Sequence, residues 1–359
     1  MWRGLRWLGT GLLFLAVAVS FAPTAIPPFL DRIYYDGPVS GHYDGARFFN
    51  PLAGPERARR RGNIVDRFGN ASGERAVWPE HVPVRQTVPP RRVEGERMLV
   101  TWIGHATVLV QTAGLNILTD PIWSERASPF SFIGPRRVRA PGVRFEDLPK
   151  IDVVLVSHNH YDHMDLPTLR RLWARDRSVI VTSLGNDTIL RNAGIEAVAR
   201  DWGGRVPLGN GTEVIVARNH HWSSRWFTDR NRALWSAFAV RTPSGNIFFA
   251  GDTGWGDGSW AREAARLGPY RLAILPIGAY EPREVMASNH VNPEEAMQVF
   301  EIMNPVTALG MHWGTFQLTW EPIDEPWQRL AALRRARGLA PARFVATPVG
   351  LTFAVPTFR

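Results

Sequence analysis

Three histidines and an aspartate lie close together in one short segment of the chain, residues 157–163 (SHNHYDH). They are His158, His160, Asp162 and His163, and the whole chain has only 10 histidines. The segment directly follows an apolar run (IDVVLV) that is typical of a buried strand, and a turn after that strand can direct all four side chains into one pocket. Because imidazole nitrogen and carboxylate oxygen are ligands that Zn²⁺ accepts, the segment predicts a metal site.

Side chains of the same types follow later apolar runs. His221 comes after EVIVARNH, Asp252 after NIFFAG, and His312 after VTALGM. If these runs are strands of a layered structure, their ends can bring all of the candidates to one edge, where seven ligands would suit two metal ions. His220 directly precedes His221, and residue type and position leave both open as the ligand.

The elements that must position these residues begin at Met98. β-branched residues alternate through residues 98–120, which favours strands joined by a turn at Gly114. Further strands are predicted at residues 151–157, 178–182, 213–217, 234–241, 246–250, 271–275 and 306–311. Helices are predicted at residues 166–173, 260–267, 293–303 and 325–337, with Asp165 able to cap the first of them. This mixture predicts an α/β layered domain over residues 98–359.

The residues before this domain have a different character. Residues 31–97 are rich in Pro, Gly and Arg and show no sustained period, so we expect an irregular extension there. Residues 1–30 contain Arg3 and Arg6, followed by an apolar stretch at 8–22, which predicts a signal peptide or a membrane anchor. Either interpretation places the rest of the chain on the outer face of a membrane, anchored there or exported to the periplasm.

Composition excludes several classes of protein. With 359 residues, 45% of them hydrophobic and 11% aromatic, the chain can bury a core, which excludes disorder as its main state. The absence of cysteine excludes a disulfide scaffold, thiolate ligands and a cysteine nucleophile. The net charge of +9 comes almost wholly from arginine, and residues 1–97 hold 14 arginines against 9 acidic residues. Because this charge lies beside the apolar stretch, an anionic membrane surface is a better partner than nucleic acid.

Several of these motifs together resemble a known family. HNHYDH matches the HxHxDH motif of the metallo-β-lactamase fold superfamily, and GDTG and HWGTF match its later ligand motifs. More closely, TWIGHATVLVQTAGLNILTDPIWSERASP, SHNHYDHMD, HHW, PIGAYEPR, HVNPEEA and MHWGTF resemble the N-acyl-phosphatidylethanolamine-hydrolysing phospholipase D family. The resemblance covers roughly residues 40–355 and implies an αββα four-layer sandwich of the metallo-β-lactamase type.

The resemblance also implies which residues hold metal. Two Zn²⁺ ions are expected, although other divalent metals fit the same ligands. One ion would be held by His158, His160 and His221, the other by Asp162, His163 and His312, and Asp252 would bridge them. His221 is chosen over His220 because it stands just before Trp222, as in the His-Trp pair of the family.

A mechanism and a set of supporting residues follow from this resemblance. A hydroxide held between the two metals would attack a phosphodiester while the cations offset the developing charge. Asp162 is expected to be mainly a ligand, with a role as proton acceptor when only one metal is bound. His290 is expected to position the phosphate or to protonate the leaving oxygen. Four further residues are expected to orient the ligands or to line the pocket: His105, Asp120, Tyr280 and Glu281.

The predicted function is a zinc-dependent phosphodiesterase of phospholipase D type that acts on a phospholipid-like substrate, beside a membrane surface. The alternative is a lactone, ester or amide hydrolase with the same centre. A nuclease or a regulatory binding protein of this fold has less support. No GxSxG motif or P-loop occurs, which excludes serine-hydrolase and P-loop chemistry. The sequence leaves the oligomeric state open.

Overall fold

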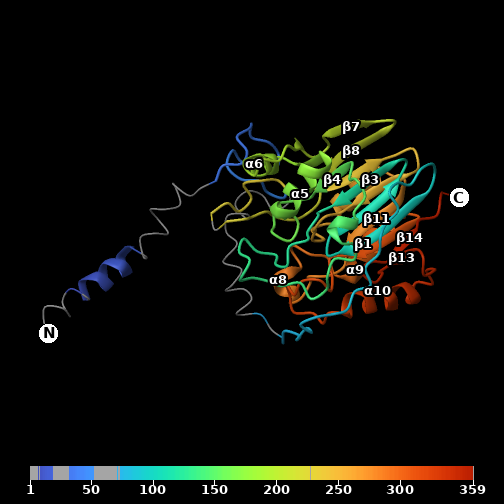
Figure 1. The fold of residues 1–359 in the computed structure, drawn as a ribbon. Helices are drawn as coiled ribbons and strands as arrows, with labels where there is room; N and C mark the ends of the chain where they lie inside the picture. The colour runs from blue at the N-terminus through green and yellow to red at the C-terminus, as the bar shows by residue number, and fades with distance from the viewer. Residues whose placement is uncertain are drawn as a thin grey trace.

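Two seven-stranded sheets lie at the centre of the described residues of this computed structural model, which are 7, 9–18, 32–51, 71, 73–226 and 228–358 (Figure 1). The first sheet has the order β14-β1-β2-β3-β4-β5-β6. Its strands are β1 (Met98–Gly104), β2 (Thr107–Thr112), β3 (Leu115–Thr119), β4 (Val153–Val156), β5 (Val179–Ser183), β6 (Val198–Arg200) and β14 (Thr352–Ala354). The second has the order β13-β12-β11-β10-β9-β8-β7. Its strands are β7 (Arg205–Gly209), β8 (Thr212–Ala217), β9 (Ala237–Arg241), β10 (Asn246–Phe249), β11 (Tyr270–Pro276), β12 (Thr307–Met311) and β13 (Phe344–Val345).

Alternation of side chains along each strand explains how the first sheet is covered on both faces. In β4, Val153 and Leu155 belong to the core that also contains strands of the second sheet, whereas Val154 and Val156 belong to a second apolar cluster. Successive side chains of a strand point to opposite faces, so a fully apolar strand must be buried on both sides. The runs of apolar residues in the sequence therefore identify internal strands.

Helices cover the outer face of each sheet. Leu169 of α5 (Leu166–Asp176) and Leu190 of α6 (Asn186–Asn192) pack in the same cluster as the outward side chains of the first sheet. On the second sheet, α9 (Pro293–Met303) contacts β11, and both α7 (Ser259–Ala265) and α10 (Glu325–Ala336) contact α9. The short α8 (Arg283–Met286) and the 3-10 turn η1 (Phe145–Asp147) lie in connections. The expected αββα four-layer sandwich is confirmed.

One detail of the first helix differs from the sequence prediction. Asp165 is the residue before α5, but its side chain makes no capping hydrogen bond to that helix. Its carboxylate accepts hydrogen bonds from the Thr168 hydroxyl of α5 and from the backbone N–H groups of Trp123 and Ser124 outside the helix. A tertiary contact therefore replaces the local cap, and Asp165 ties the loop after β3 to the start of α5.

The described part of the N-terminal extension packs on the sandwich. Tyr43 and Phe48 are buried against Leu234 and Trp235, and the backbone N–H of Phe48 donates to the carbonyl of Asn231. Residues 9–18, inside the predicted apolar segment, are helical and exposed, and residues 1–6 and 19–31 lie outside the described residues. Among the described residues, none of the helices has both the length and the apolarity needed to cross a membrane.

Candidate metal centre

Strand direction explains why the candidate ligands meet at one edge of the sandwich. In the second sheet β10 and β12 are both parallel to β11, and β8 runs in the same direction because two antiparallel pairings separate it from β10. Asp252, His312 and His221 therefore all follow the same ends of their strands. In the first sheet β3 and β4 are parallel, so their ends carry Asp120 and His158 to one edge.

One group of ligand atoms comes from His158, His160 and His221, whose nitrogens lie within 4.8 Å of one another. His158 Nε2 is 2.8 Å from His160 Nδ1, and His221 Nε2 is buried without a hydrogen-bond partner. Burial holds the pKa of His158 and of His221 well below the usual 6.5 and lowers the pKa of His160 to about 3. Three neutral imidazoles thus present lone pairs to one point, as a divalent metal requires.

A second group surrounds His163 Nε2 and His312 Nε2, which are 3.1 Å apart. Asp252 Oδ2 lies 3.0 Å from the first nitrogen and 3.1 Å from the second, and Asp162 Oδ2 lies 3.3 and 3.5 Å from them. Burial lowers the pKa of His312, but the Asp252 and Asp162 carboxylates outweigh it and raise that pKa to about 9. For His163, too, the nearby carboxylates outweigh burial, and its pKa lies well above the usual value. Two carboxylates therefore stabilise a positive charge at this point.

Asp252 lies close to both groups of ligand atoms, as a bridging ligand must. Its Oδ2 contacts the second group and is 3.9 Å from His221 Nε2 of the first, while its Oδ1 is buried without a partner. The preceding Gly251 has a φ of +59°, and a Cβ there would lie 2.7 Å from the Cβ of Ser157. Glycine thus permits the turn that directs the carboxylate inward. Orphaned buried atoms and an all-nitrogen-and-oxygen donor set fit divalent metal ions such as Zn²⁺.

Asp120 fixes the tautomers of two of these histidines. It accepts hydrogen bonds from His163 Nδ1 at 2.7 Å and from Ser157 Oγ at 2.6 Å, and Ser157 Oγ in turn accepts from His158 Nδ1 at 2.9 Å. When these imidazoles are neutral, with the proton on Nδ1, their Nε2 atoms carry the lone pairs that a metal ion needs. His221 is fixed in the same way, since its Nδ1 donates to the carbonyl of Asn289 at 2.9 Å.

His105 and His290 also adjoin the centre. Burial lowers the pKa of His105 to about 3, and its Nε2 donates to Asp162 Oδ2 at 2.9 Å. His290 Nε2 is 3.9 Å from Asp252 Oδ2, and its Nδ1 is buried without a partner. The position of His105 suits the orienting role predicted for it. His290 lies beside the ligands with one ring nitrogen available.

The other predicted residues lie apart from these groups. Tyr280 donates its hydroxyl hydrogen to Glu325 Oε1 at 2.8 Å, and Glu281 Oε2 accepts from the backbone N–H of Arg283. Both are committed to neighbouring segments, and a pocket role for them stays a prediction. His220 is half-buried, and among the described residues the metal-binding groups contain His221 but not His220.

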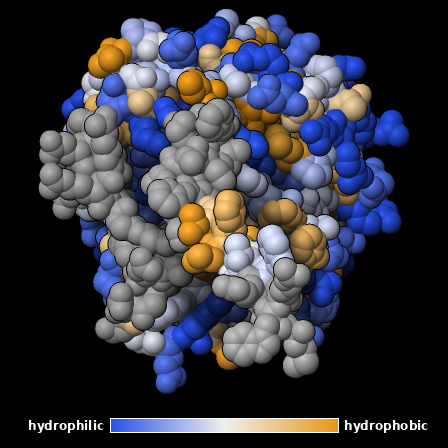
Figure 2. Space-filling view, turned by 90° about the vertical axis from the view of Figure 1, so that its left-hand side faces the viewer, coloured by the Kyte–Doolittle hydropathy of each residue, from blue (hydrophilic) through white to orange (hydrophobic). Residues whose placement is uncertain are grey.

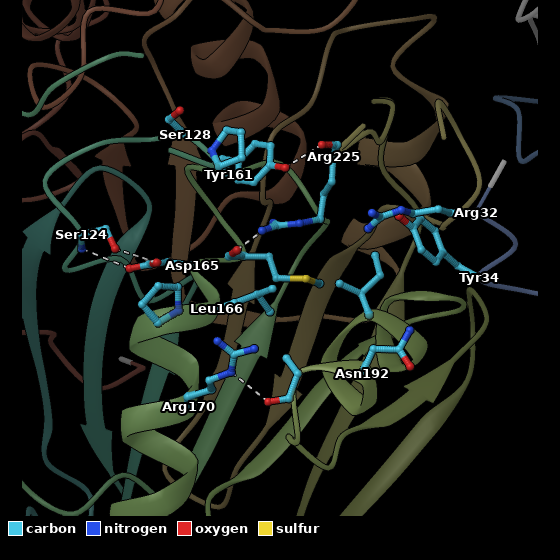
Figure 3. Close-up of a pocket in the computed structure, with 15 residues that line it drawn as sticks. Arg32, Tyr34, Ser124, Ser128, Tyr161, Asp165, Leu166, Arg170, Asn192 and Arg225 are labelled. Carbon is cyan, nitrogen blue, oxygen red and sulfur yellow. Dashed lines mark hydrogen bonds between the residues drawn. The ribbon is translucent and has the colours of Figure 1, made fainter. Parts of the chain in front are cut away.

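A cavity of about 440 Å³ adjoins the segment that carries the ligands (Figure 3). Tyr161 and Met164 line this cavity, as do Arg32, Arg170 and Arg225. Arg225 donates through Nη1 to the carbonyls of Asn159 and Met164, and its guanidinium lies over the Tyr161 ring. Hydrophilic residues cover much of the surface that Figure 2 shows outside its grey atoms, with hydrophobic groups in smaller patches. Sequence reasoning did not find this basic lining, because arginines at distant positions form it.

Comparison with known proteins identifies relatives of the chain. Residues 115–313 match the family described as the beta-lactamase superfamily domain. The chain is 36% identical over 293 residues to N-acyl-phosphatidylethanolamine-hydrolyzing phospholipase D 1 of Caenorhabditis elegans, covering 78% of this chain and 82% of the relative. It is 33% identical over 240 residues to the mitochondrial N-acyl-phosphatidylethanolamine-hydrolyzing phospholipase D of Saccharomyces cerevisiae, covering 65% of this chain and 51% of the relative. The metallo hydrolase Igni18 of Ignicoccus hospitalis has the same fold, with a TM-score of 0.55, 20% identity, and coverage of 73% of this chain and 100% of that one.

Proposed function

Since the chain belongs to the beta-lactamase superfamily, and within it to the family of N-acyl-phosphatidylethanolamine-hydrolyzing phospholipases D, we propose that this metal-dependent hydrolase cleaves a phosphodiester bond of a phospholipid-like substrate. The observation that carries the proposal is the pair of ligand groups with Asp252 close to both, 3.9 Å from His221 of the first and 3.0 and 3.1 Å from His163 and His312 of the second. Two ions in these groups would be held by histidine and aspartate alone, and Zn²⁺ fits that donor set. Fold alone would not distinguish substrates.

The residues of the chain have distinct tasks in this proposal. Divalent ions bound here would supply activation of water near neutral pH and would offset negative charge on the phosphate. Asp120 and the Asn289 carbonyl hold the imidazoles of His163 and His221 with their Nε2 lone pairs directed inward. Asp162 is held by His105 and stays ionised, because the imidazole of His163 outweighs burial and keeps the pKa of Asp162 well below its usual range.

His290 is the residue that we expect to contact the substrate. Its Nδ1 has no hydrogen-bond partner among the described residues, and its ring centroid is 5.2 Å from that of His221 and 5.4 Å from that of His312. A ring nitrogen so placed can bind a phosphate oxygen or the leaving oxygen of a substrate.

Charge at the cavity and exposed apolar residues close to it in sequence support a lipid substrate. In the described part of the chain, three arginines and one acidic residue, Asp165, line the cavity, and this excess of positive charge supports binding of a phosphate. Beyond Ser128, which also lines the cavity, Phe130, Phe132 and Ile133 are 47, 77 and 58% exposed. Exposed aromatic and aliphatic side chains beside arginines suit the interface of an anionic bilayer.

The test is a hydrolysis panel with the metal-loaded protein. Vesicles that contain N-acyl-phosphatidylethanolamine, phosphatidylethanolamine or phosphatidylcholine form one arm, and lactones, carboxylic esters and amides form the other. We expect phosphatidic acid and a released alcohol from the first arm, with no opening of lactones. Turnover confined to the second arm would refute phosphodiesterase activity and support the alternative hydrolase.

We also propose that the hydrolase works at the outer face of a membrane, as an anchored or an exported protein. Arg3 and Arg6 before the apolar stretch at 8–22 support this location. Fractionation of cells that express the full chain tests it. We expect the protein in the membrane or periplasmic fraction and sensitive to protease added outside the inner membrane, whereas a protease-resistant cytoplasmic pool would contradict the proposal.

A further inference from the structure

Asn219 lies two residues before His221, and its side chain contacts the backbone on both sides of Gly251. Its side chain is 2% exposed. The amide nitrogen Nδ2 donates one hydrogen bond to the carbonyl of Ala250 and another to the carbonyl of Asp252, both at 2.9 Å. The amide oxygen Oδ1 is buried without a partner. The hydrogen bonds of this side chain are therefore made by its two amide N–H groups.

The orientation of the amide follows from its partners. Both partners are carbonyl oxygens, which accept only, so a flipped amide would set oxygen against oxygen. The orphaned Oδ1 carries the cost of desolvation without a compensating bond. We infer that the two donated hydrogen bonds offset this cost by stabilising the local structure.

The two carbonyls that Asn219 contacts flank Gly251, whose φ is +59°. A residue with left-handed backbone angles relies on its surroundings to hold the turn. Asn219 closes this turn from one side by holding the carbonyl before Gly251 and the carbonyl after it. One of these two carbonyls belongs to Asp252 itself, so Asn219 holds the backbone from which the Asp252 carboxylate extends.

Neighbouring bonds make the contact into a strap between residues 219–221 and 252–254. The backbone N–H of His220 donates to Thr253 Oγ1 at 3.0 Å, and the backbone N–H of Gly254 donates to the carbonyl of His220 at 2.7 Å. The strap ends at His221. It links the backbone next to His221 to the backbone that carries the Asp252 carboxylate.

We propose that Asn219 is a positioning residue that sets Asp252 relative to His221 and thereby gives the metal centre its affinity. The inference rests on the metal centre of the proposed function. Its hydrogen bonds go to the backbone carbonyls of Ala250 and Asp252, so it acts through the backbone. No sequence motif quoted above assigns a role to it.

The chain offers a matched control in Asn186. Its Nδ2 donates to the carbonyls of Ser183 and Leu234, at 3.1 and 2.8 Å, and its Oδ1 is also buried without a partner. The contact holds α6 against the end of β5 and involves no ligand residue. Alanine at either position removes the same kind of bonds, so a purely structural role predicts the same result for both.

The experiment measures Zn²⁺ affinity of the full chain by competition with a chromophoric chelator, and Co²⁺ absorption as a second signal. For Asn219→Ala we expect a metal dissociation constant about 10–100-fold higher, as for other supports of metal ligands. For Asn186→Ala we expect a lower melting temperature with metal affinity like that of the natural chain. Asn219→Ser, which keeps one donor, should give an intermediate affinity and serves as the variant if the alanine protein fails to fold.

The outcomes separate the role of Asn219 from the proposed function. Natural metal affinity in Asn219→Ala or Asn219→Ser, or an equal loss in Asn186→Ala, would overturn the role of Asn219. A natural chain that binds two ions but cleaves no phosphodiester would refute the proposed substrate and leave the role of Asn219 intact. A natural chain that binds no metal would overturn both.

Discussion

Replacing Asp120 by asparagine tests how the protein prepares its histidines for metal. The buried carboxylate accepts from the backbone N–H of Ser157 at 2.7 Å through Oδ1, and from Ser157 Oγ and His163 Nδ1 through Oδ2. An asparagine amide has only one acceptor oxygen and presents N–H groups at the other position. It therefore cannot satisfy both sides of this network.

Each orientation of the new amide has a defined cost. With nitrogen in place of Oδ1, the backbone N–H of Ser157 loses its acceptor, which costs about 1–3 kcal/mol of stability. With nitrogen in place of Oδ2, an N–H group faces His163 Nδ1–H, and the imidazole must move its proton to Nε2. That proton would occupy the lone pair directed at His312 and Asp252.

We expect the metal dissociation constant of Asp120→Asn to rise about 10–100-fold, which corresponds to roughly 1.4–2.8 kcal/mol. Chelator competition measures it, with thermal unfolding alongside. Asp176→Asn is the control, because Asp176 is also buried and accepts from the backbone N–H of Ile151 at 2.9 Å, at the opposite end of β4. Natural metal affinity in Asp120→Asn, or an equal loss in Asp176→Asn, would refute the reasoning.

The remaining predictions concern single ligands, the substrate and the Asp252 turn. His221→Ala should leave about one metal per chain and His220→Ala about two, as counted by metal analysis, since His221 and not His220 joins the first ligand group; equal counts would contradict that choice. His290→Asn should lower turnover of a phosphodiester with full metal content, because His290 is assigned to the substrate; loss of metal would make it a ligand. Gly251→Ala should unfold at lower temperature and bind metal weakly, since left-handed φ costs about 1–2 kcal/mol and the new Cβ would lie 2.7 Å from Ser157 Cβ; unchanged melting and affinity would contradict the clash.

The placement of the ligands could be predicted from sequence because it depends on a simple rule. Buried strands read as apolar runs, and His158, Asp252 and His312 each follow such a run at its end. The helices predicted at residues 293–303 and 325–337 correspond to α9 and α10 because both carry clear start signals, including the Asn292 capping box of α9.

Other features depend on contacts between distant segments, which residue patterns do not encode. Asn219 donates to carbonyls more than 30 residues away, and Asp165 accepts from backbone N–H groups some 40 residues earlier in the chain. The extension at residues 31–97 has no periodic pattern, so the sequence does not indicate that Asn50 within it donates to the carbonyl of His221 at 2.9 Å. Short elements such as α6 and β6 have too few residues to show a period.

The most direct test of the central claim is the number of metal ions in the purified chain and in Asp252→Ala, measured beside phosphodiester hydrolysis. We expect about two zinc or similar divalent ions per natural chain. In Asp252→Ala we expect loss of metal and of hydrolysis together, because the carboxylate adjoins both ligand groups. One tightly bound ion in the natural chain, with hydrolysis unchanged in Asp252→Ala, would contradict the account.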